Sequence, residues 1–498
     1  MKYISTRSSS STCTSAEAIV RGLAKDGGLF LPEAIPTVTP ADIDRLRGLD
    51  YAERAAYILS LFLTDFSHEE LLGYCRTAYS AGNFPVSGTA PLRQLYGPAY
   101  ILELFHGPTC AFKDFALQIL PHLLTASMQK CGVDKTVLIL VATSGDTGKA
   151  ALAGFANVPG TKICVFYPHG GVSDIQRLQM TTQCGNNVCV AGVRGNFDDT
   201  QNGVKAIFSD NDFGEELAGK GQILSSANSI NWGRLAPQIA YYFSAYCDLL
   251  NTGAVSPGGQ INVTVPTGNF GNILAAYYAK CCGLPIKTLL CASNENKVLA
   301  DFISTGIYDR NRPFYNTASP SMDILISSNL ERLLYLLSGG DDARIRGYMD
   351  DLRTKGRYQL EDETLAQLQS DFAAGWADDA MGAETIGQAF RENGYVCDTH
   401  TAVGLRVYQD YAKATGDTTP TIIASTASPF KFCGSVLPAL GADVPDDSFA
   451  MLDKLAQISG LPVPNGLSEL QNRPERFAAI IGKDIMCEIV DVLADLTL

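Results

Sequence analysis

Residues 135–149 read KTVLILVATSGDTGK, and this stretch sets the fold class of the chain. Its first eight residues, Lys135 to Ala142, form a short and continuous apolar run, which is typical of a strand buried on both faces of a parallel sheet. A glycine-containing loop follows over 143–148, and an Ala-rich helix is expected over 149–156. A strand, a loop and a helix in this order form the repeating unit of an α/β sheet.

The same unit recurs along the chain. Further strands are predicted over 162–167, 187–193, 261–265, 286–291 and 421–424, and further helices over 175–182, 198–208 and 273–281. This alternation predicts parallel sheets that are covered by helices on both faces and bind ligands at the carboxyl ends of the strands. We therefore expect an α/β protein whose site lies in strand-to-helix loops.

The N-terminal part of the chain has a different pattern, which we interpret as helices and loops. Residues 41–46 and 51–62 have helical apolar spacing, and Pro85 and Pro91 then place a boundary near residue 95. A second helical stretch is predicted over 319–392. It contains an amphipathic stripe typical of core packing, formed by Leu330, Leu333, Leu334 and Leu337.

Composition excludes several classes of protein. Hydrophobic residues make up 46% of the 498 residues and charged residues 18%, which argues against disorder. A net charge of −14 disfavours nucleic acid as a partner, and no run reaches the roughly 18 apolar residues of a membrane span. The 14 cysteines include no C-x-x-C pair and the N-terminus has no secretory pattern, so we expect free thiols and a cytoplasmic protein.

The loop over 265–272, VPTGNFGN, follows a predicted buried strand and opens a helix. Its two glycines let the backbone approach an anion closely, and the N–H groups at the positive helix end can bind it. A phosphorylated cofactor is one interpretation. A plain turn is the other, because many glycine loops at such junctions bind nothing.

The loop over 143–148 only superficially resembles a nucleotide-binding loop. That motif requires glycine at position 143 and Ser or Thr after the lysine, whereas this chain has Thr143 and Ala150. What remains is a helix N-terminus rich in hydroxyl and N–H groups, which suits a carboxylate. The five histidines, His400 among them, show no metal-ligand spacing and are interpreted as surface or hydrogen-bonded core residues.

Lys113 lies among phenylalanines in the segment 105–115, FHGPTCAFKDF. Burial in this apolar context would lower the pKa of its amine, which a lysine that bonds covalently to a carbonyl cofactor requires. The same context fits a lysine that lies along apolar surface and reaches water. Composition alone favours the second interpretation.

At this segment the chain resembles the threonine synthases of the long type, which carry an extra N-terminal domain. The cofactor lysine of that family lies in a segment like GPTxAFKD, and residues 107–114 read GPTCAFKD. Further segments match in family order over nearly the whole chain, at 3–7, 27–32, 143–149, 172–180, 195–199, 226–234, 265–272, 398–402 and 425–432. Ser428 and Thr399 depart from the His and Pro that are common in the family.

The resemblance implies the tryptophan-synthase-β-like fold of pyridoxal-phosphate enzymes (fold type II), an α/β fold. Its cofactor lies between two parallel-sheet domains. The expected domains are a mainly helical N-terminal domain (1–95), a smaller α/β domain (116–222), and a larger cofactor-binding α/β domain (96–115 and 223–498) with the helical insertion around 319–392.

The implied cofactor is pyridoxal 5′-phosphate (PLP). By resemblance, Lys113 holds PLP covalently and later moves protons, Thr426 faces the ring nitrogen, and Asp146 lies near the 3′-oxygen. A neutral hydroxyl at the ring nitrogen makes the ring a weaker electron sink than a carboxylate would. The residues expected to cradle the cofactor phosphate are Gly268, Asn269, Phe270, Gly271 and Asn272.

The resemblance also implies substrate-binding residues. The substrate carboxylate is expected at Ser144, Gly145 and Thr147, and the substrate phosphate at Asn228, Asn231 and Arg234. Arginine suits a phosphate because its guanidinium offers a bidentate fork. Lys149 and Arg177 are weaker candidates, since surface helix roles account for them equally well.

The implied activity is that of a threonine synthase, a PLP-dependent carbon–oxygen lyase. It converts O-phospho-L-homoserine and water to L-threonine and phosphate by γ-elimination and β-addition. A phospho-lyase that releases phosphate, a keto acid and ammonia shares every cofactor motif, so the sequence separates the two poorly. A β-replacement enzyme and a non-catalytic scaffold are more distant alternatives. We expect a small-molecule substrate, no nucleic-acid or membrane partner, and a monomer or homodimer.

Overall fold

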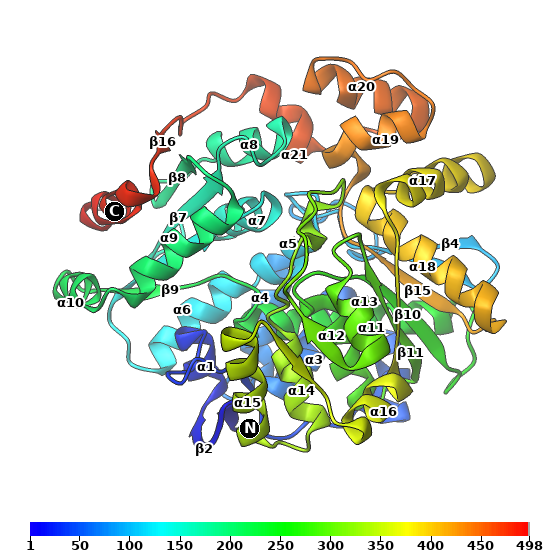
Figure 1. Cartoon of the computed structure of the whole chain (residues 1–498), viewed down its shortest axis with the longest axis horizontal. Coiled ribbons are helices and arrows are strands. Elements are labelled where there is room, and N and C mark those ends of the chain that lie inside the picture. The colour runs from blue at the N-terminus through cyan, green and yellow to red at the C-terminus, as the bar shows by residue number, and fades with distance from the viewer. Residues whose placement is uncertain (497–498) are drawn as a thin grey trace.

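The computed structural model describes residues 1–496 and contains two largely parallel sheets in two α/β lobes (Figure 1). The sheet of the large lobe has six strands, and only its edge strand β4 runs antiparallel to its neighbour β5. Its strand order is β14 (Phe372–Trp376), β11 (Ile286–Ser293), β10 (Ile261–Pro266), β15 (Thr421–Ser425), β5 (Ala99–Glu103) and β4 (Leu92–Tyr96). The α/β fold class is confirmed.

The sheet of the small lobe has five parallel strands. Its strand order is β16 (Ile480–Ile481), β8 (Val188–Val193), β7 (Thr161–Pro168), β6 (Thr136–Ala142) and β9 (Gln222–Ser225). In β6, residues 137–141 are at most 1% exposed, as the continuous apolar run predicts for a strand covered on both faces. Each of these sheets presents the carboxyl ends of its parallel strands at one edge.

Helices cover both sheets, and the predicted strand–helix alternation is confirmed. The small lobe has α6 (Leu120–Lys130), α7 (Asp146–Phe155), α8 (Asp174–Thr181), α9 (Phe197–Ser209) and α10 (Asn211–Gly219). The large lobe has α5 (Lys113–Leu117), α11 (Trp232–Asn251), α12 (Gly271–Cys281), α13 (Val298–Thr305), α14 (Leu330–Leu337), α15 (Asp342–Thr354), α16 (Asp362–Asp371), α17 (Asp379–Asn393) and α18 (Thr399–Thr415). The leucines predicted as a core stripe on α14 are all buried.

The N-terminal helices begin where their sequence caps them. They are α1 (Ser15–Arg21), α2 (Pro40–Arg47), α3 (Tyr51–Phe62) and α4 (His68–Ala78). Each has a capping box, in which the side chain before the helix and an acidic side chain three residues later satisfy each other's backbone N–H groups. These caps fix the helix starts without help from the rest of the fold.

Four features differ from the sequence prediction. A three-stranded antiparallel sheet of β1 (Tyr3–Ser5), β2 (Ser8–Cys13) and β3 (Phe30–Pro32) lies in the region predicted as helices and loops, because its strands are too short to show a period. The predicted boundary at residue 95 falls inside β4, which pairs with β5. The predicted helical insertion over 319–392 contains β14, whose sequence FAAGW has no β-branched residue but pairs with β11. A two-stranded antiparallel pair, β12 (Ile307–Asp309) with β13 (Arg357–Gln359), joins that insertion to α13.

The small lobe also extends beyond the predicted 116–222. Strand β9 crosses that limit, and β16 arrives from the C-terminal part of the chain, after α19 (Cys433–Ala439), α20 (Ser448–Ser459) and α21 (Asn465–Ser468). Figure 1 shows the last helix, α22 (Met486–Asp495), on the small-lobe side of the molecule. Lys162 of β7 fixes this helix, because its Nζ donates to the carbonyls of Ala494 (2.6 Å) and Leu496 (2.7 Å). The chain therefore enters the small lobe twice.

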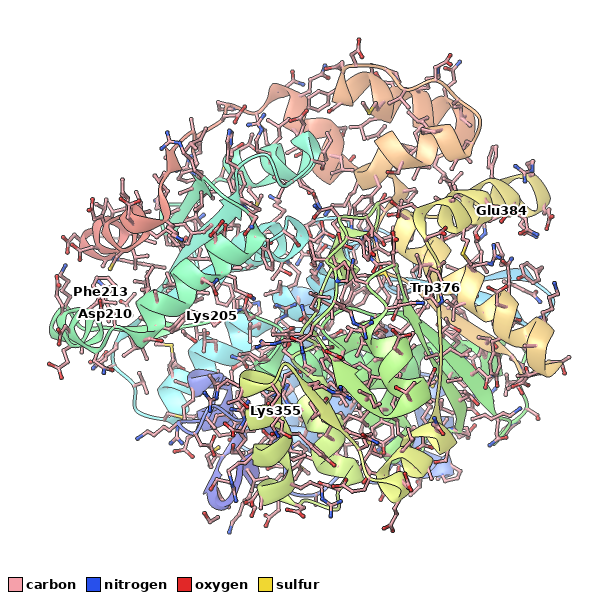
Figure 2. All side chains as sticks on the ribbon, viewed as in Figure 1. Lys205, Asp210, Phe213, Lys355, Trp376 and Glu384 are labelled. Carbon is pink, nitrogen blue, oxygen red and sulfur yellow. The ribbon has the colours of Figure 1, made fainter. Side chains whose placement is uncertain are left out.

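Side chains fill the space between the ribbons (Figure 2). In that view the labelled Lys205 and Phe213 lie on the small-lobe side, and Trp376 and Glu384 on the large-lobe side. Within residues 1–496 no cysteine is in a disulfide, and most of the thiols are buried, as expected. None of the helices in this range combines the length and apolar character needed to cross a bilayer.

Candidate active site

The turn that carries Lys113 is fixed to the end of β15. It leaves β5 and places Cys110 at φ 60°, a left-handed conformation that is uncommon for a residue with a side chain. Phe112 N–H donates to the Thr426 carbonyl (2.9 Å), and Ser428 N–H donates to the Cys110 carbonyl (3.0 Å). Lys113 is the first residue of α5, so its side chain starts from a rigid junction between two segments.

Asp114 stabilises the same turn from inside. Its carboxylate accepts hydrogen bonds from the backbone N–H (2.8 Å) and the hydroxyl (2.7 Å) of Thr109. Burial raises the pKa of the Asp114 carboxyl to about 6, although these hydrogen bonds oppose the shift. A Cβ on Gly107 would lie 2.5 Å from the Asp114 side chain, which explains the glycine. Asp114, the residue that directly follows the Gly107–Lys113 turn, thus stabilises it through these hydrogen bonds.

The Lys113 amine lies at the centre of the candidate site. Its Nζ donates to Ser321 Oγ (3.2 Å) and lies 3.7 Å from Asp146 Oδ2. Burial lowers the pKa of Lys113 to about 8; Asp146 opposes this shift, and the positive charges of Lys431 and Arg234 add to it. With a pKa of about 8, about one tenth of the amine is unprotonated at pH 7, far more than for an ordinary lysine, and the free amine is the form that a nucleophile or base requires. This lowered pKa is what burial in an apolar segment produces, and it favours a buried Lys113 over a lysine that reaches water.

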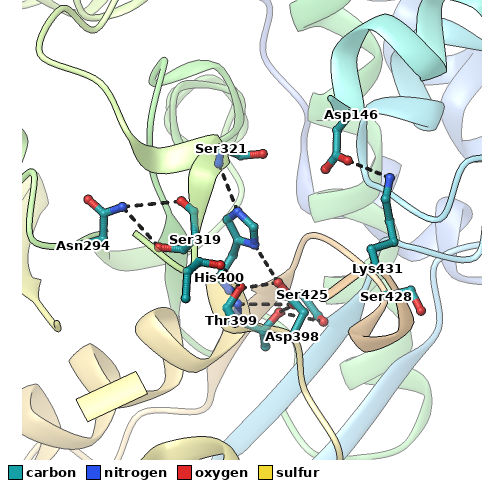
Figure 3. A network of polar contacts seen from close by, with 12 residues as sticks. Asp146, Asn294, Ser319, Ser321, Asp398, Thr399, His400, Ser425, Ser428 and Lys431 are labelled. Carbon is teal, nitrogen blue, oxygen red and sulfur yellow. Dashed lines mark hydrogen bonds and ion pairs between the residues drawn. The ribbon is translucent and has the colours of Figure 1, made fainter. Parts of the chain in front are cut away.

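Asp146 comes from the small lobe, at the first turn of α7, and lies opposite Lys113. Its Oδ1 pairs with Lys431 Nζ (2.7 Å; Figure 3) and accepts from Gln176 Nε2 (2.9 Å). Burial would raise the pKa of this carboxyl, but Lys431 and Lys113 together hold it well below its ordinary range. The carboxylate is therefore ionised although it is almost fully buried.

The glycine loop between β10 and α12 is shaped to receive an anion. Phe270 adopts φ 62° before α12, and the loop carbonyls point away, since Ser327 Oγ donates to the Gly268 carbonyl (2.7 Å) and Asn329 Nδ2 to that of Asn269 (3.0 Å). A Cβ on Gly268 would lie 2.5 Å from the Ser321 carbonyl. The loop thus keeps its N–H groups and the helix end available for a ligand.

The loop between β6 and α7 has a similar form. Gly145 has φ 129°, and Thr143 Oγ1 accepts from the N–H groups of Gly145 (3.0 Å) and Gly148 (2.9 Å). Ser144 and Thr147 are half-buried on either side of Asp146. Asp146, which lies between them in the sequence, is 3.7 Å from the Lys113 amine, so this loop belongs to the same site.

Of the three residues predicted for a substrate phosphate, only Arg234 and Asn228 keep free side-chain groups. Arg234 is 3% exposed, burial lowers its pKa to about 10, and within residues 1–496 its guanidinium has no carboxylate partner and an unpaired Nε. Asn228 is half-buried. Asn231 is used structurally: its Oδ1 caps α11 at Gly233 N–H (2.9 Å) and its Nδ2 donates to the Ile19 carbonyl (2.9 Å). The prediction for Asn231 is therefore wrong.

Comparisons with known proteins agree over the whole chain. Residues 2–79 match the family model "Threonine synthase N terminus", residues 82–425 match "Pyridoxal-phosphate dependent enzyme", and residues 401–486 match "Threonine synthase, C-terminal". The chain belongs to the threonine synthase family. Within that family its cofactor is PLP.

Individual members of the threonine synthase family cover most of the chain. Threonine synthase of Pseudomonas aeruginosa is 39% identical over 90% of this chain and 93% of its own length. The crystal structure of PLP-bound threonine synthase from Brucella melitensis superposes with a TM-score of 0.88 at 37% identity, covering both chains fully. Human threonine synthase-like 1 is 42% identical over 90% of this chain, which spans only 61% of that protein.

The residues present fit the PLP of the threonine synthase family. Asn272 accepts from the Tyr242 hydroxyl through Oδ1, while its buried Nδ2 has no partner within residues 1–496. That amide and the open glycine loop would hold the cofactor phosphate, and Lys113 would bond to the aldehyde carbon. Thr426, 6% exposed at the end of β15, lies beside the Lys113 turn, as the predicted contact with the ring nitrogen requires.

Three residues that surround Lys113 and Asp146 directly or through one contact, Lys431, Ser321 and His400, were not assigned to the site from the sequence. Lys431 lies between two phenylalanines and so has the same apolar context as Lys113. The sequence does not show, however, that its partner is Asp146. Ser321 and His400 come from separate segments that meet only in the fold. Of the weaker candidates, Lys149 is buried with a pKa lowered to about 8, chiefly by burial, and donates to Gln183 Oε1 (2.5 Å). Arg177 pairs with Glu475 at the surface, so a surface role accounts for it.

His400 links the α18 N-terminus to Ser321 (Figure 3). Its Nδ1 lies 2.8 Å from Asp398 Oδ1, and its Nε2 accepts the Ser321 backbone N–H (3.2 Å). Because Nε2 is an acceptor, the proton of the neutral ring is on Nδ1, facing the buried carboxylate. His400 is a hydrogen-bonded core histidine, as predicted, and it fixes the residue that contacts the Lys113 amine.

Replacing His400 with Phe should lower the free energy of unfolding by about 1–3 kcal/mol, because the buried Asp398 carboxylate and the half-buried Ser321 N–H each lose a partner. His400→Gln places an acceptor near the position of Nε2 and should lose less. Denaturant unfolding of the two variants checks this. Equal stability of His400→Phe and the unaltered chain would mean that the two hydrogen bonds contribute nothing.

Proposed function

We propose that this chain is a threonine synthase, which converts O-phospho-L-homoserine and water to L-threonine and phosphate. The observation that supports this most is the buried Arg234 guanidinium, which acts on the Lys113 amine electrostatically and has no carboxylate partner within residues 1–496. The Arg234 guanidinium donates to the neutral Ala227 carbonyl, and a buried cation without an anionic partner is unfavourable unless a ligand supplies the negative charge. A phosphate ester meets that requirement, and Arg234 with Asn228 would bind it.

Each remaining group has a role in this proposal. PLP, when bound, withdraws electrons and acidifies the C–H bonds next to the substrate's amino group. The substrate carboxylate would bind at the loop of Ser144, Gly145 and Thr147, where the Ser144 and Thr147 hydroxyls are half-buried at the N-terminal end of α7. The Lys113 amine would take the proton from the substrate's Cα and return protons later in the reaction. Thr426 presents a neutral hydroxyl to the ring nitrogen, so control of the reaction depends on the placement of Lys113.

A second candidate is a phospho-lyase on the same scaffold, releasing phosphate, a keto acid and ammonia. The alternative is kept because the 42% identity to human threonine synthase-like 1, a relative whose name does not state this reaction, is above the 39% identity to the Pseudomonas aeruginosa threonine synthase. For either activity we propose a small-molecule substrate, no nucleic-acid partner, a cytoplasmic location, and a monomer or homodimer.

Incubation of the PLP-loaded protein with O-phospho-L-homoserine should yield L-threonine in step with phosphate. Amino-acid analysis and a phosphate assay on the same sample measure both products. Phosphate accompanied by 2-oxobutyrate and ammonia would replace the synthase with the phospho-lyase. Absence of any phosphate release would reject both, while leaving the PLP enzyme assignment unaffected.

A further inference from the structure

The Asp146 carboxylate is shared unequally between two buried lysines. Its Oδ1 lies 2.7 Å from Lys431 Nζ, whereas its Oδ2 lies 3.7 Å from Lys113 Nζ. Gln176 Nε2 also donates to Oδ1, at 2.9 Å. Lys431 and Gln176 therefore bind the Asp146 carboxylate more closely than the Lys113 amine does.

Lys431 is itself held rigidly. It lies in the short 3-10 helix Pro429–Phe432 that follows β15, its side chain is 0% exposed, and its Nζ donates to the Thr109 carbonyl (3.0 Å). Thr109 belongs to the turn that carries Lys113 and closes that turn through Asp114. Lys431 thus connects the large-lobe turn to Asp146 of the small lobe, as Figure 3 shows for the ion pair.

We propose that Lys431 is a positioning residue, which holds the Asp146 carboxylate and thereby keeps the Lys113 amine free to lose and take up protons. This inference rests on the proposed role of Lys113. Without Lys431, the carboxylate would have only one buried cation left to pair with, and a close ion pair would keep Lys113 protonated. A protonated amine can neither attack an aldehyde nor act as a base.

The charges around Lys113 support this inference. Asp146 from α7 favours the charged amine, and Lys431 and Arg234 from α11 disfavour it. Ser321 adds a neutral hydroxyl from the opposite side. Removing the positive charge of Lys431 should therefore raise the pKa of Lys113. Removing the negative charge of Asp146 should lower it.

The test measures the ionisation of Lys113 directly on the full-length chain before PLP is added. Trace acetylation with acetic anhydride at a series of pH values, followed by peptide mapping, reports the fraction of unprotonated Lys113. In Lys431→Met the half-maximal pH should rise by about one unit, which is about tenfold less free amine at pH 7. In Asp146→Asn it should fall, and Lys431→Arg, which keeps the charge, should remain near the unaltered chain.

The control is Lys287→Met, since Lys287 is 43% exposed and pairs with Asp417 at the surface. It should leave the titration of Lys113 unchanged. Thermal melting identifies variants that fail to fold, and if Lys431→Met is one of them, Asp146→Asn decides the question alone. Unshifted titration in a folded Lys431→Met or Asp146→Asn variant would overturn the inference. Because no turnover is measured, a failure of the proposed threonine synthase activity is seen separately.

Discussion

Replacing Lys113 with Ala should reduce turnover of O-phospho-L-homoserine by at least about 10²–10⁴-fold, because the chain loses its positioned acid–base group. The variant should also lose the visible absorbance of lysine-bound PLP. The large effect follows from the geometry, since Lys113 is the amine that Ser321 and Asp146 contact from two sides. Absorbance spectra and phosphate release, measured on the same preparation, check both effects.

The control variant is Lys287→Ala. Lys287 is exposed and pairs with Asp417 rather than with these residues, so this variant should retain full activity. The Lys113→Ala variant should remain folded, because losing a buried amine removes only one hydrogen bond to Ser321. Retained absorbance or retained turnover in Lys113→Ala would disprove the assignment of the cofactor lysine.

Replacing Gly268 with Ala should weaken PLP binding by about 10²-fold, the loss that a misplacement of about 1 Å can cause at a site. The new Cβ would lie 2.5 Å from the Ser321 carbonyl, and both atoms belong to backbone segments that cannot rotate away. Either the glycine loop or the Ser321 turn must move. Titration of the PLP-free protein with PLP, followed by absorbance, measures the change in dissociation constant.

Gly382→Ala provides the matched substitution, because a Cβ at this position on α17 meets no atom within 4 Å. It should bind PLP like the unaltered chain and gain slightly in helix stability. If Gly268→Ala bound PLP with unchanged affinity, the glycine loop would not be the phosphate site. The Ser321 turn would then have to be more mobile than its hydrogen bond to His400 implies.

The sequence predicts those parts of the fold that are local. Strand β6 is recognisable because an apolar run of its length suits only a strand covered on both faces, and the helices α2 and α3 because their apolar spacing is regular. Strand β14 is not recognisable, since its Ala and Gly residues become a strand only through pairing with β11. The three-stranded N-terminal sheet was missed for a different reason, because β1 and β3 have three residues each and the sequence SSSSTC of β2 has no apolar alternation.

The residues of the candidate site also fall into two groups: those that a continuous segment of sequence reveals, and those whose roles depend on distant partners. Lys113 and the two glycine loops could be proposed from the sequence, by resemblance to the family, because one continuous segment carries each of them. Lys431 and His400 were missed because their roles depend on partners far along the chain, Asp146 and Ser321. Asn231 was misassigned since an asparagine before a helix serves equally well as a cap or as a ligand, and only the contact with Ile19 distinguishes the two.

The late return of β16 to the small lobe has a consequence for biosynthesis. The strand pairs with β8 through Ile480↔Gly192 and Ile481↔Val193, so β8 remains an open edge while the ribosome makes the rest of the chain. An uncovered parallel edge can recruit other nascent chains. The sheet of the lobe that contributes Asp146 therefore gains its last strand about 55 residues later in synthesis than β15, the last strand of the sheet beside Lys113.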